Sequence, residues 1–249
     1  MAKLNLKLMQ EKLAKLNKKT GGSYLKIEDG KKNLPLRIVP DKDGDPFKEF
    51  YFHYRMGEGY GSVLCPKMNS NGRESCAICD FVATLYKGGE VEKEHAKEIK
   101  AKNRYYSNVI DRENEGDGVQ TWGYSKTVYR KLIETCLDEE YGDITDIDEG
   151  FDLRVSKTKD SGKAWFEVNF TPSRKESSLS DDPEKAEKWV ESQPDISFKE
   201  YTSEEVEDIL EQYIATTTGV EGEESRGGGD DTEDKKNKMD AIRQQLSGD

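Results

Sequence analysis

The chain of 249 residues is poor in apolar residues, and this shortage limits the size of the core that it can form. Only 33% of its residues are apolar and 36% are charged, which predicts one compact body with polar, partly mobile ends. No apolar run is long enough to span a bilayer, so we expect no membrane partner. A secretory signal is not expected either, because the first residues lack its apolar stretch and cleavage site. These absences predict an intracellular protein.

The motifs of common enzyme classes are also missing. The sequence contains no P-loop, no G-x-S-x-G elbow and no H-E-x-x-H zinc motif. A zinc deaminase needs H-x-E and P-C-x-x-C, but Ser75 precedes the C-x-x-C pair, and neither His53 nor His95 begins H-x-E. The sequence therefore predicts a binding or structural protein without catalytic activity.

Three of the four cysteines gather in one window with a histidine. The spacing is H-x11-C-x10-C-x2-C over 27 residues. Such a cluster fits a metal in a reducing compartment better than it fits disulfides. Three thiolates and an imidazole form a closed tetrahedral shell, which suits one structural zinc ion and leaves no open position for chemistry. The predicted ligands are His53, Cys65, Cys76 and Cys79.

The second histidine is an alternative ligand. His95 follows Cys79 by 16 residues, which is within the range of some zinc sites. Its neighbours at 92–97 are mostly charged, as on a solvated helix, so His53 is preferred. The remaining cysteine, Cys136, lies in a predicted helix and is expected to be a buried structural thiol.

Charge is distributed unevenly along the chain, whose net charge is −12. Residues 1–20 carry six lysines and one glutamate, whereas residues 195–249 carry 16 acidic and six basic residues. A basic head and an acidic tail hint at nucleic-acid binding or at binding through the tail. Glycine and acidic residues dominate 216–234, so we expect a disordered acidic tail over 216–249.

Residues 3–19 predict a short basic amphipathic helix, because leucine and methionine recur at three- and four-residue steps. Three interpretations stay open. The helix is a solvated surface helix, an arm that docks on a neighbouring copy or partner, or a helix at a membrane surface, although no aromatic anchor accompanies its apolar stripe.

Short strands and turn-rich links dominate the middle of the chain. Strands are predicted at 34–39, 47–54, 103–112, 119–124, 151–158 and 164–171, and helices at 76–86, 91–102, 127–140, 183–190 and 203–214. Ser125 is a candidate N-cap, and Thr202 with Glu205 is a candidate capping box. This order predicts an α+β fold, with an antiparallel β-barrel of OB type, an inserted structural zinc subdomain at about 53–102, and flanking helices.

Aromatic residues are interleaved with cations along these strands. This composition suits a single-strand binder, because unstacked bases lie on aromatic faces while cations follow the phosphates. Aromatic residues on strands also pack in cores, and strand neighbours face opposite sides, so one of each adjacent pair is expected to face a groove. The candidate DNA-contacting residues in this pattern are Lys100, Lys102, Arg104, Tyr105, Tyr106, Trp122, Tyr124, Lys126, Arg130 and Trp165.

The Cys/His window, followed by the basic strand with Tyr105 and Tyr106, resembles the single-stranded-DNA-binding proteins of T-even-type bacteriophages, the gene-32 or helix-destabilising proteins. That family has a basic N-terminal arm, an OB core with inserted zinc and an acidic tail in the same order. The resemblance covers roughly residues 1–215, and the tail in character only. It implies the same four zinc ligands and a DNA cleft with Tyr105, Tyr106 and, on a second strand, Trp122 and Tyr124.

The resemblance also places Tyr86 near a cleft tyrosine. Two positions depart from the family pattern: Arg73 lies where the family has a tyrosine, and His95 lies where another cleft aromatic is expected. Both side chains could still contact DNA, by charge and by ring stacking. The N-terminal arm also lacks a compact Lys-Arg-Lys cluster.

The resemblance implies a phage protein that coats single-stranded DNA in the cytoplasm of the infected bacterium, during replication, recombination and repair. The arm at 1–20 would bind the neighbouring copy and make binding cooperative, and the core at 21–215 would bind DNA without sequence preference. The tail at 216–249 would compete with DNA and recruit replication and recombination proteins. The alternatives are a zinc-containing scaffold or transcription accessory protein that acts through its tail, and an RNA-binding OB protein.

Overall fold

The computed structural model describes residues 24–56, 61–159 and 161–218, which form two compact units. Within the described residues, the first unit is 24–49 with 104–197, and the second is 50–103 with 198–218. The predicted N-terminal arm and almost all of the acidic tail lie outside the described residues.

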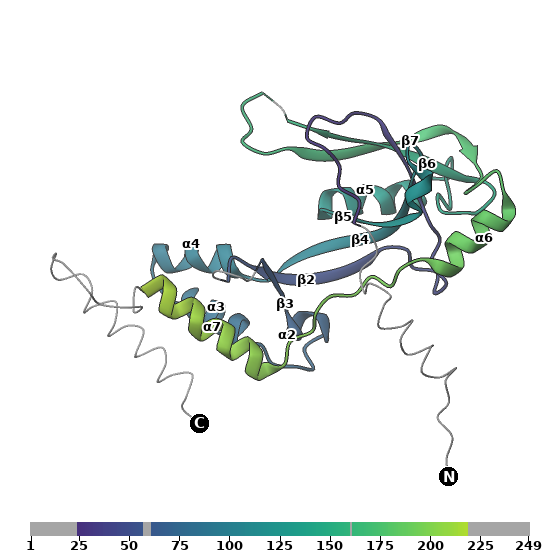
Figure 1. Cartoon of the computed structure of the whole chain (residues 1–249). Coiled ribbons are helices and arrows are strands. Elements are labelled where there is room, and N and C mark those ends of the chain that lie inside the picture. The colour runs from purple at the N-terminus through teal and green to yellow at the C-terminus, as the bar shows by residue number, and fades with distance from the viewer. Residues whose placement is uncertain (1–23, 57–60, 160, 219–249) are drawn as a thin grey trace, which may run out of the picture. The chain divides into compact units, whose positions relative to one another are not determined.

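Helices and strands are divided between the units. The first unit contains β1 (Leu34–Ile38), the 3-10 helix η1 (Glu115–Asp117), β5 (Val119–Tyr124), α5 (Lys126–Cys136), β6 (Gly150–Thr158), β7 (Glu167–Ser177) and α6 (Pro183–Ser192). The second contains β3 (Ser62–Leu64), α2 (Pro66–Asn69), α3 (Ala77–Leu85), α4 (Glu90–Ile99) and α7 (Ser203–Thr218). Two strands, β2 (Lys48–Tyr54) and β4 (Lys102–Asp111), have residues in both (Figure 1).

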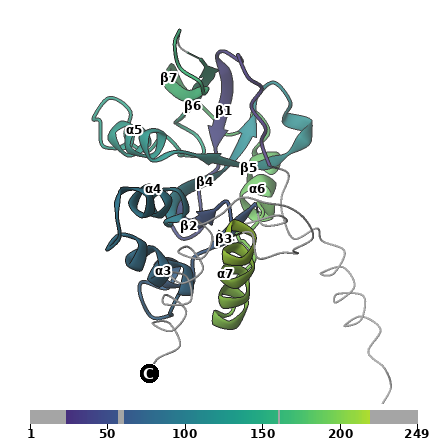
Figure 2. The same ribbon diagram turned by 90° about the vertical axis from the view of Figure 1, so that its left-hand side faces the viewer.

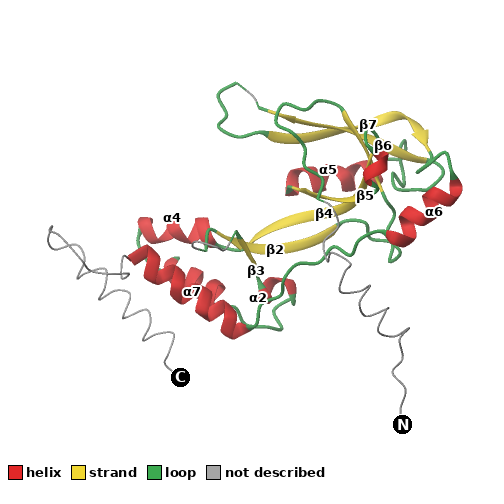
Figure 3. Ribbon diagram, in the orientation of Figure 1, coloured by secondary structure: helices red, strands yellow, loops and turns green. Residues whose placement is uncertain are grey.

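The strands form a seven-stranded antiparallel sheet in the order β3-β2-β4-β1-β6-β7, with β5 also paired to β4. The long β6–β7 hairpin is visible in yellow in Figure 3. The predicted α+β class is therefore confirmed. Closure into a barrel is not seen, because no pairing of the described strands joins the two ends of this order.

The core of the first unit lies between the sheet and α5. Successive strand residues point to opposite faces, and every third or fourth residue of a helix lies on one side. Trp122 and Tyr124 of β5 therefore share a face, which packs against Val128 and Leu132 of α5. Figures 1 and 3 show α5 along this side of β4 and β5.

Helix α5 ends at Cys136, four residues earlier than the predicted end at 140. Asp138 explains the difference, because its carboxylate accepts a hydrogen bond from the backbone N–H of Glu140 at 2.9 Å. This Asx turn gives the backbone an alternative to helical bonding.

The opposite side of β4 and β5, called the outer face below, carries Arg104, Tyr106 and Asn108 of β4 with Thr121 and Gly123 of β5. Its far end is covered by α6. There Val39, Ile110, Leu179, Ala186 and Trp189 form a small buried cluster.

The second unit is mainly helical and has its own apolar core. Phe81 of α3, Ile99 of α4 and Ile209 of α7 belong to one buried cluster, and Figure 2 shows these helices grouped together. The predicted capping box at the start of α7 is confirmed. The N–H of Thr202 donates to the Glu205 carboxylate at 2.9 Å, and the N–H of Glu205 donates to the Thr202 hydroxyl at 3.2 Å.

Other predicted elements differ in detail. Ser125 is the N-cap residue of α5, as predicted, but its side chain makes no capping bond. Strand β3 and helix α2 were not predicted, because three or four residues are too few to produce a periodic pattern. No helix in the described part of the chain is long and apolar enough to cross a bilayer.

The burial of two tryptophans generates a stability prediction. Trp122 is 2% exposed in the core, whereas Trp165 is 63% exposed. Trp122→Ala should lower the free energy of unfolding by about 3–5 kcal/mol, and Trp165→Ala by less than about 0.5 kcal/mol. Urea denaturation followed by circular dichroism measures both. Equal effects of the two substitutions would contradict the assignment of Trp122 to the core.

Candidate metal centre and nucleic-acid interface

His53, Cys65, Cys76 and Cys79 converge within the second unit. Their ligand atoms all lie within 4.8 Å of one another, and the first three residues are buried. The sulfurs of Cys65 and Cys79 are 3.5 Å apart, and Nε2 of His53 lies 3.5 Å and 3.6 Å from the sulfurs of Cys76 and Cys79. Ligand atoms of a tetrahedral zinc site, with bonds of 2.0–2.3 Å, are separated by roughly 3.4–3.8 Å. The cluster could therefore hold a metal ion such as zinc.

Three of the four residues are positioned by strands and helix starts of the second unit. His53 lies on β2 opposite Val63 of β3, and its Nδ1–H donates to the carbonyl of Ile99 at 2.8 Å. That bond leaves Nε2 to face the sulfurs of Cys76 and Cys79, as in metal sites whose histidine is oriented by a second partner. Cys65 and Cys76 are the N-cap residues of α2 and α3.

The four groups also share protons among themselves. Hydrogen bonds with Cys65 and Cys79 lower the pKa of Cys76, and hydrogen bonds with Cys65 and Cys76 raise the pKa of Cys79. Burial alone would lower the pKa of His53, but hydrogen bonds to Cys65 and Cys76 raise it to about 9. A metal binds thiolates and neutral imidazole, so its binding must release protons at neutral pH.

His95, the alternative ligand, lies elsewhere in the second unit. Its Nε2 is hydrogen-bonded to the hydroxyl of Tyr213 on α7, and its ring meets Phe81 edge-on at 6.3 Å. It is absent from the described His/Cys cluster, which contains His53 instead. Arg73, the other departure from the family pattern, is exposed.

Three of the aromatic residues predicted to contact DNA are buried in the first unit. Tyr105, Trp122 and Tyr124 are only 3%, 2% and 1% exposed. The Tyr105 ring stacks on the ring of Tyr129 with centroids 3.9 Å apart, and the Tyr124 hydroxyl is hydrogen-bonded to Ser107 at 2.7 Å. Their strand positions direct these side chains toward α5, and they offer no face for a base.

Arg104 and Tyr106 alternate with these residues along β4 and point to the outer face, where both are half-buried. A guanidinium and a phenol ring two residues apart on a strand combine a phosphate contact with a stacking surface. Lys102 is the next residue toward the start of β4 in the same alternation, and it is exposed.

Four of the predicted cations are exposed: Lys100 after α4, Lys102 on β4, and Lys126 and Arg130 on α5. None of the four forms an ion pair with another described residue. Tyr86, which follows α3, is 39% exposed. All five are accessible to a ligand within their own unit.

The β6–β7 hairpin exposes a second aromatic group. Trp165 is 63% exposed and Phe166 is 37% exposed. Lys159, which no sequence pattern identified, lies with Nζ 6.0 Å from the centre of the Phe166 ring. The pairing of the two strands brings Lys159 and Phe166 together, because six residues lie between them along the chain.

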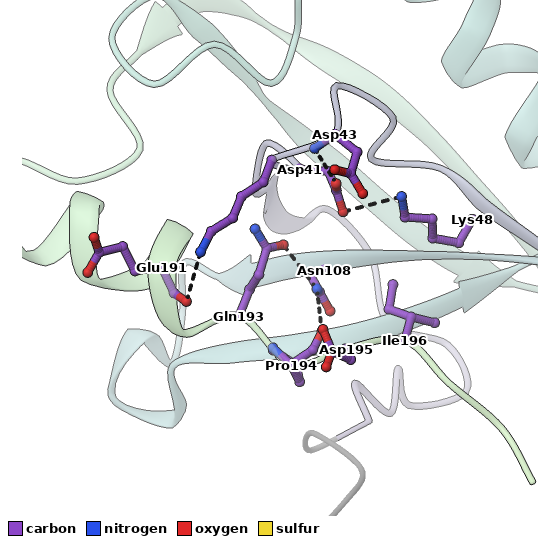
Figure 4. Close-up of a pocket in the computed structure, with 10 residues that line it drawn as sticks. Asp41, Asp43, Lys48, Asn108, Glu191, Gln193, Pro194, Asp195 and Ile196 are labelled. Atoms are coloured by element: carbon purple, nitrogen blue, oxygen red, sulfur yellow. Dashed lines mark hydrogen bonds and ion pairs between the residues drawn. The ribbon is translucent and has the colours of Figure 1, made fainter.

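A polar pocket of about 350 Å³ lies beside Asn108, where the outer face meets the end of α6 (Figure 4). The Asn108 amide donates to Gln193 at 3.1 Å and to the carbonyl of Pro194 at 2.9 Å, so its hydrogen bonds are satisfied by protein. Four carboxylates and two lysines line the pocket: Asp41, Asp43, Glu191, Asp195, Lys42 and Lys48. This negative balance disfavours phosphate, so the pocket is not part of the candidate interface.

Comparison with known proteins adds one match. The model of a family described as gp32 DNA binding protein like matches residues 29–217, which is more than half of the chain. The match includes the four residues of the His/Cys cluster and the outer face. No curated protein matches the chain.

The cluster geometry predicts that loss of one thiolate abolishes metal binding. Cys76→Ser should reduce bound zinc from about one ion per chain to near zero and lower the thermal midpoint by about 10 °C or more, because metal binding in such sites contributes to folding. Plasma mass spectrometry and calorimetry measure the two effects. The matched control, Cys136→Ser, changes a cysteine outside the cluster and should keep the metal. Equal zinc content in both variants would refute the site.

Proposed function

The chain belongs to the family described as gp32 DNA binding protein like, and from this membership we propose that it binds single-stranded DNA. The observation that carries the proposal is the match over residues 29–217, together with a cation and an aromatic ring on the outer face of β4. Binding without catalysis agrees with a His/Cys cluster whose four side chains would leave a metal ion no open position for substrate or water.

In the proposed mechanism, electrostatic capture comes first and stacking follows. Arg104 and Lys102 contact phosphates, and a base stacks on the ring of Tyr106. Trp165 on the β6–β7 hairpin supplies a separate stacking surface, and Tyr86, Lys100, Lys126 and Arg130 are further candidate contacts. Every base has a flat face, so this binding would tolerate any sequence.

The metal, which we propose to be zinc, has a structural role in this mechanism. His53, Cys65, Cys76 and Cys79 would hold it and fix the start of α2 and α3 relative to β2. We also propose that the sheet belongs to an OB-type barrel, on the basis of its short antiparallel strands and the family resemblance.

The remaining proposals rest on resemblance and charge alone. The basic arm at 1–20 would bind a neighbouring copy, so that the protein coats DNA cooperatively. The acidic tail at 216–249 would compete with DNA for cationic surface and recruit replication and recombination proteins. The setting would be DNA replication, recombination and repair in the cytoplasm of a phage-infected bacterium.

Substitutions on the outer face test the proposed contacts. Tyr106→Ala should weaken binding to oligothymidylate roughly 5- to 150-fold, the equivalent of one stacked base. Arg104→Ala should reduce the slope of log affinity against log salt by about 0.7, the effect of one phosphate contact. Fluorescence anisotropy at several salt concentrations measures both quantities.

The control for these substitutions is Arg174→Ala, an exposed arginine on β7 of the same unit. It should change the affinity less than twofold. Failure of the unaltered protein to bind oligothymidylate would overturn the proposed function, and tighter binding to oligouridylate would favour RNA as the ligand.

The tryptophans allow a spectroscopic test. Trp122 and Trp189 are buried and Trp165 is exposed, so Trp165 should account for most of the fluorescence that single-stranded DNA quenches. Trp165→Phe should remove at least about two-thirds of the quenching at saturating oligothymidylate. Undiminished quenching in this variant would exclude Trp165 from the interface.

A further inference from the structure

Gly123 on β5 lies directly opposite Tyr106 of β4 in the strand register. A Cβ atom at position 123 would lie 2.8 Å from Cε1 and 3.2 Å from Cδ1 of the Tyr106 ring. Side chains do not approach one another so closely, so the ring occupies the space where a side chain of residue 123 would begin. The position of the Tyr106 ring therefore depends on glycine at position 123.

The backbone carbonyl of residue 123 also binds Arg104. Nη2 of Arg104 donates a hydrogen bond to the carbonyl of Gly123 at 3.2 Å. Nε of Arg104 lies 3.7 Å from the point where the Cβ of residue 123 would be. The aromatic ring and the guanidinium thus approach the same point on the outer face.

The backbone does not by itself require glycine at this position. Gly123 is not among the described glycines with positive φ, and it lies within a regular strand. Glycine weakens a strand interior, because it gains no packing and loses more conformational freedom than other residues. The close approach of Tyr106 supplies a reason for glycine that the strand itself does not.

We propose that Gly123 is a positioning residue for single-stranded DNA, which holds the Tyr106 ring as a stacking surface and the Arg104 guanidinium beside it as a phosphate contact. The inference rests on the proposed function and adds a residue that does not itself touch DNA. A methyl group at position 123 displaces the ring by rotation of the tyrosine side chain, which needs no movement of the strand. Affinity for DNA then falls while the fold remains.

A double-mutant cycle in the full-length protein tests the proposal. Gly123→Ala should weaken binding to oligothymidylate about five- to tenfold, part of the effect of losing one stacked base. In the Tyr106→Ala background, the same substitution should change affinity less than about twofold, because the ring that it displaces is gone. A purely structural role for Gly123 would produce the same loss in both backgrounds and would overturn the proposal.

The matched control is Gly116→Ala, at a glycine of the same unit where an added Cβ meets no atom within 4 Å. It should leave DNA affinity unchanged. Unchanged affinity of Gly123→Ala, in a protein that does bind oligothymidylate, overturns the positioning role and leaves the proposed function standing. Absence of binding by the unaltered protein is the separate failure of the function itself.

Thermal stability gives a second measurement on the same variants. The thermal midpoint of Gly123→Ala should lie within about 3 °C of the unaltered protein. If the midpoint falls further, the contact with the ring predicts that Tyr106→Ala restores it in the double variant. A midpoint that stays low in the double variant would show that the ring is not what position 123 accommodates.

Discussion

The register of β4 against β5 is the constraint on which the first unit depends. It pairs Tyr105 with Tyr124 and Tyr106 with Gly123. The rings of Tyr105 and Tyr124 therefore lie together on the side facing α5, and the ring of Tyr106 lies over Gly123 on the outer face. A slip of one residue would exchange the two faces of a strand. Such a slip would expose the rings of Tyr105 and Tyr124 to water. The packing of Val128 of α5 against the buried side of β4 and β5 therefore also determines which residues lie on the outer face.

Two residues of the His/Cys cluster also stand at the starts of helices in the second unit. Cys65 is the N-cap of α2, and its sulfur accepts the backbone N–H of Met68 at 3.4 Å. Cys76 is the N-cap residue of α3, although its side chain makes no capping bond, and the ring of His53 donates a hydrogen bond to the carbonyl of Ile99. Cysteines of the His/Cys cluster therefore also stand where two helices begin, which links the cluster to the apolar core of the same unit.

The sequence was sufficient to predict which four residues form the His/Cys cluster, but it could not predict which aromatic residues face outward. The spacing of His53 and the cysteines was enough to identify the four residues that converge. The charged neighbours of His95 predicted a solvated side chain, whereas its ring is half-buried against Phe81 and hydrogen-bonded to Tyr213. Which of Tyr105 and Tyr106 faces outward depends on the pairing of β4 and on the position of α5, which no local pattern contains. Gly123 carries no signal in the sequence, because its significance lies in a ring contributed by another strand.

The second unit is assembled from two stretches of chain, and its order of synthesis has a kinetic consequence. The residues of the His/Cys cluster and α3 are synthesised more than 100 residues before α7, whose Val206 and Ile209 belong to the same buried apolar cluster as Phe81 of α3. At ribosomal rates the delay is on the order of ten seconds, far longer than a helix takes to form. For that interval the apolar side of α3 lacks its final cover, and the nascent chain must keep both that surface and three reactive thiols from aggregation and oxidation.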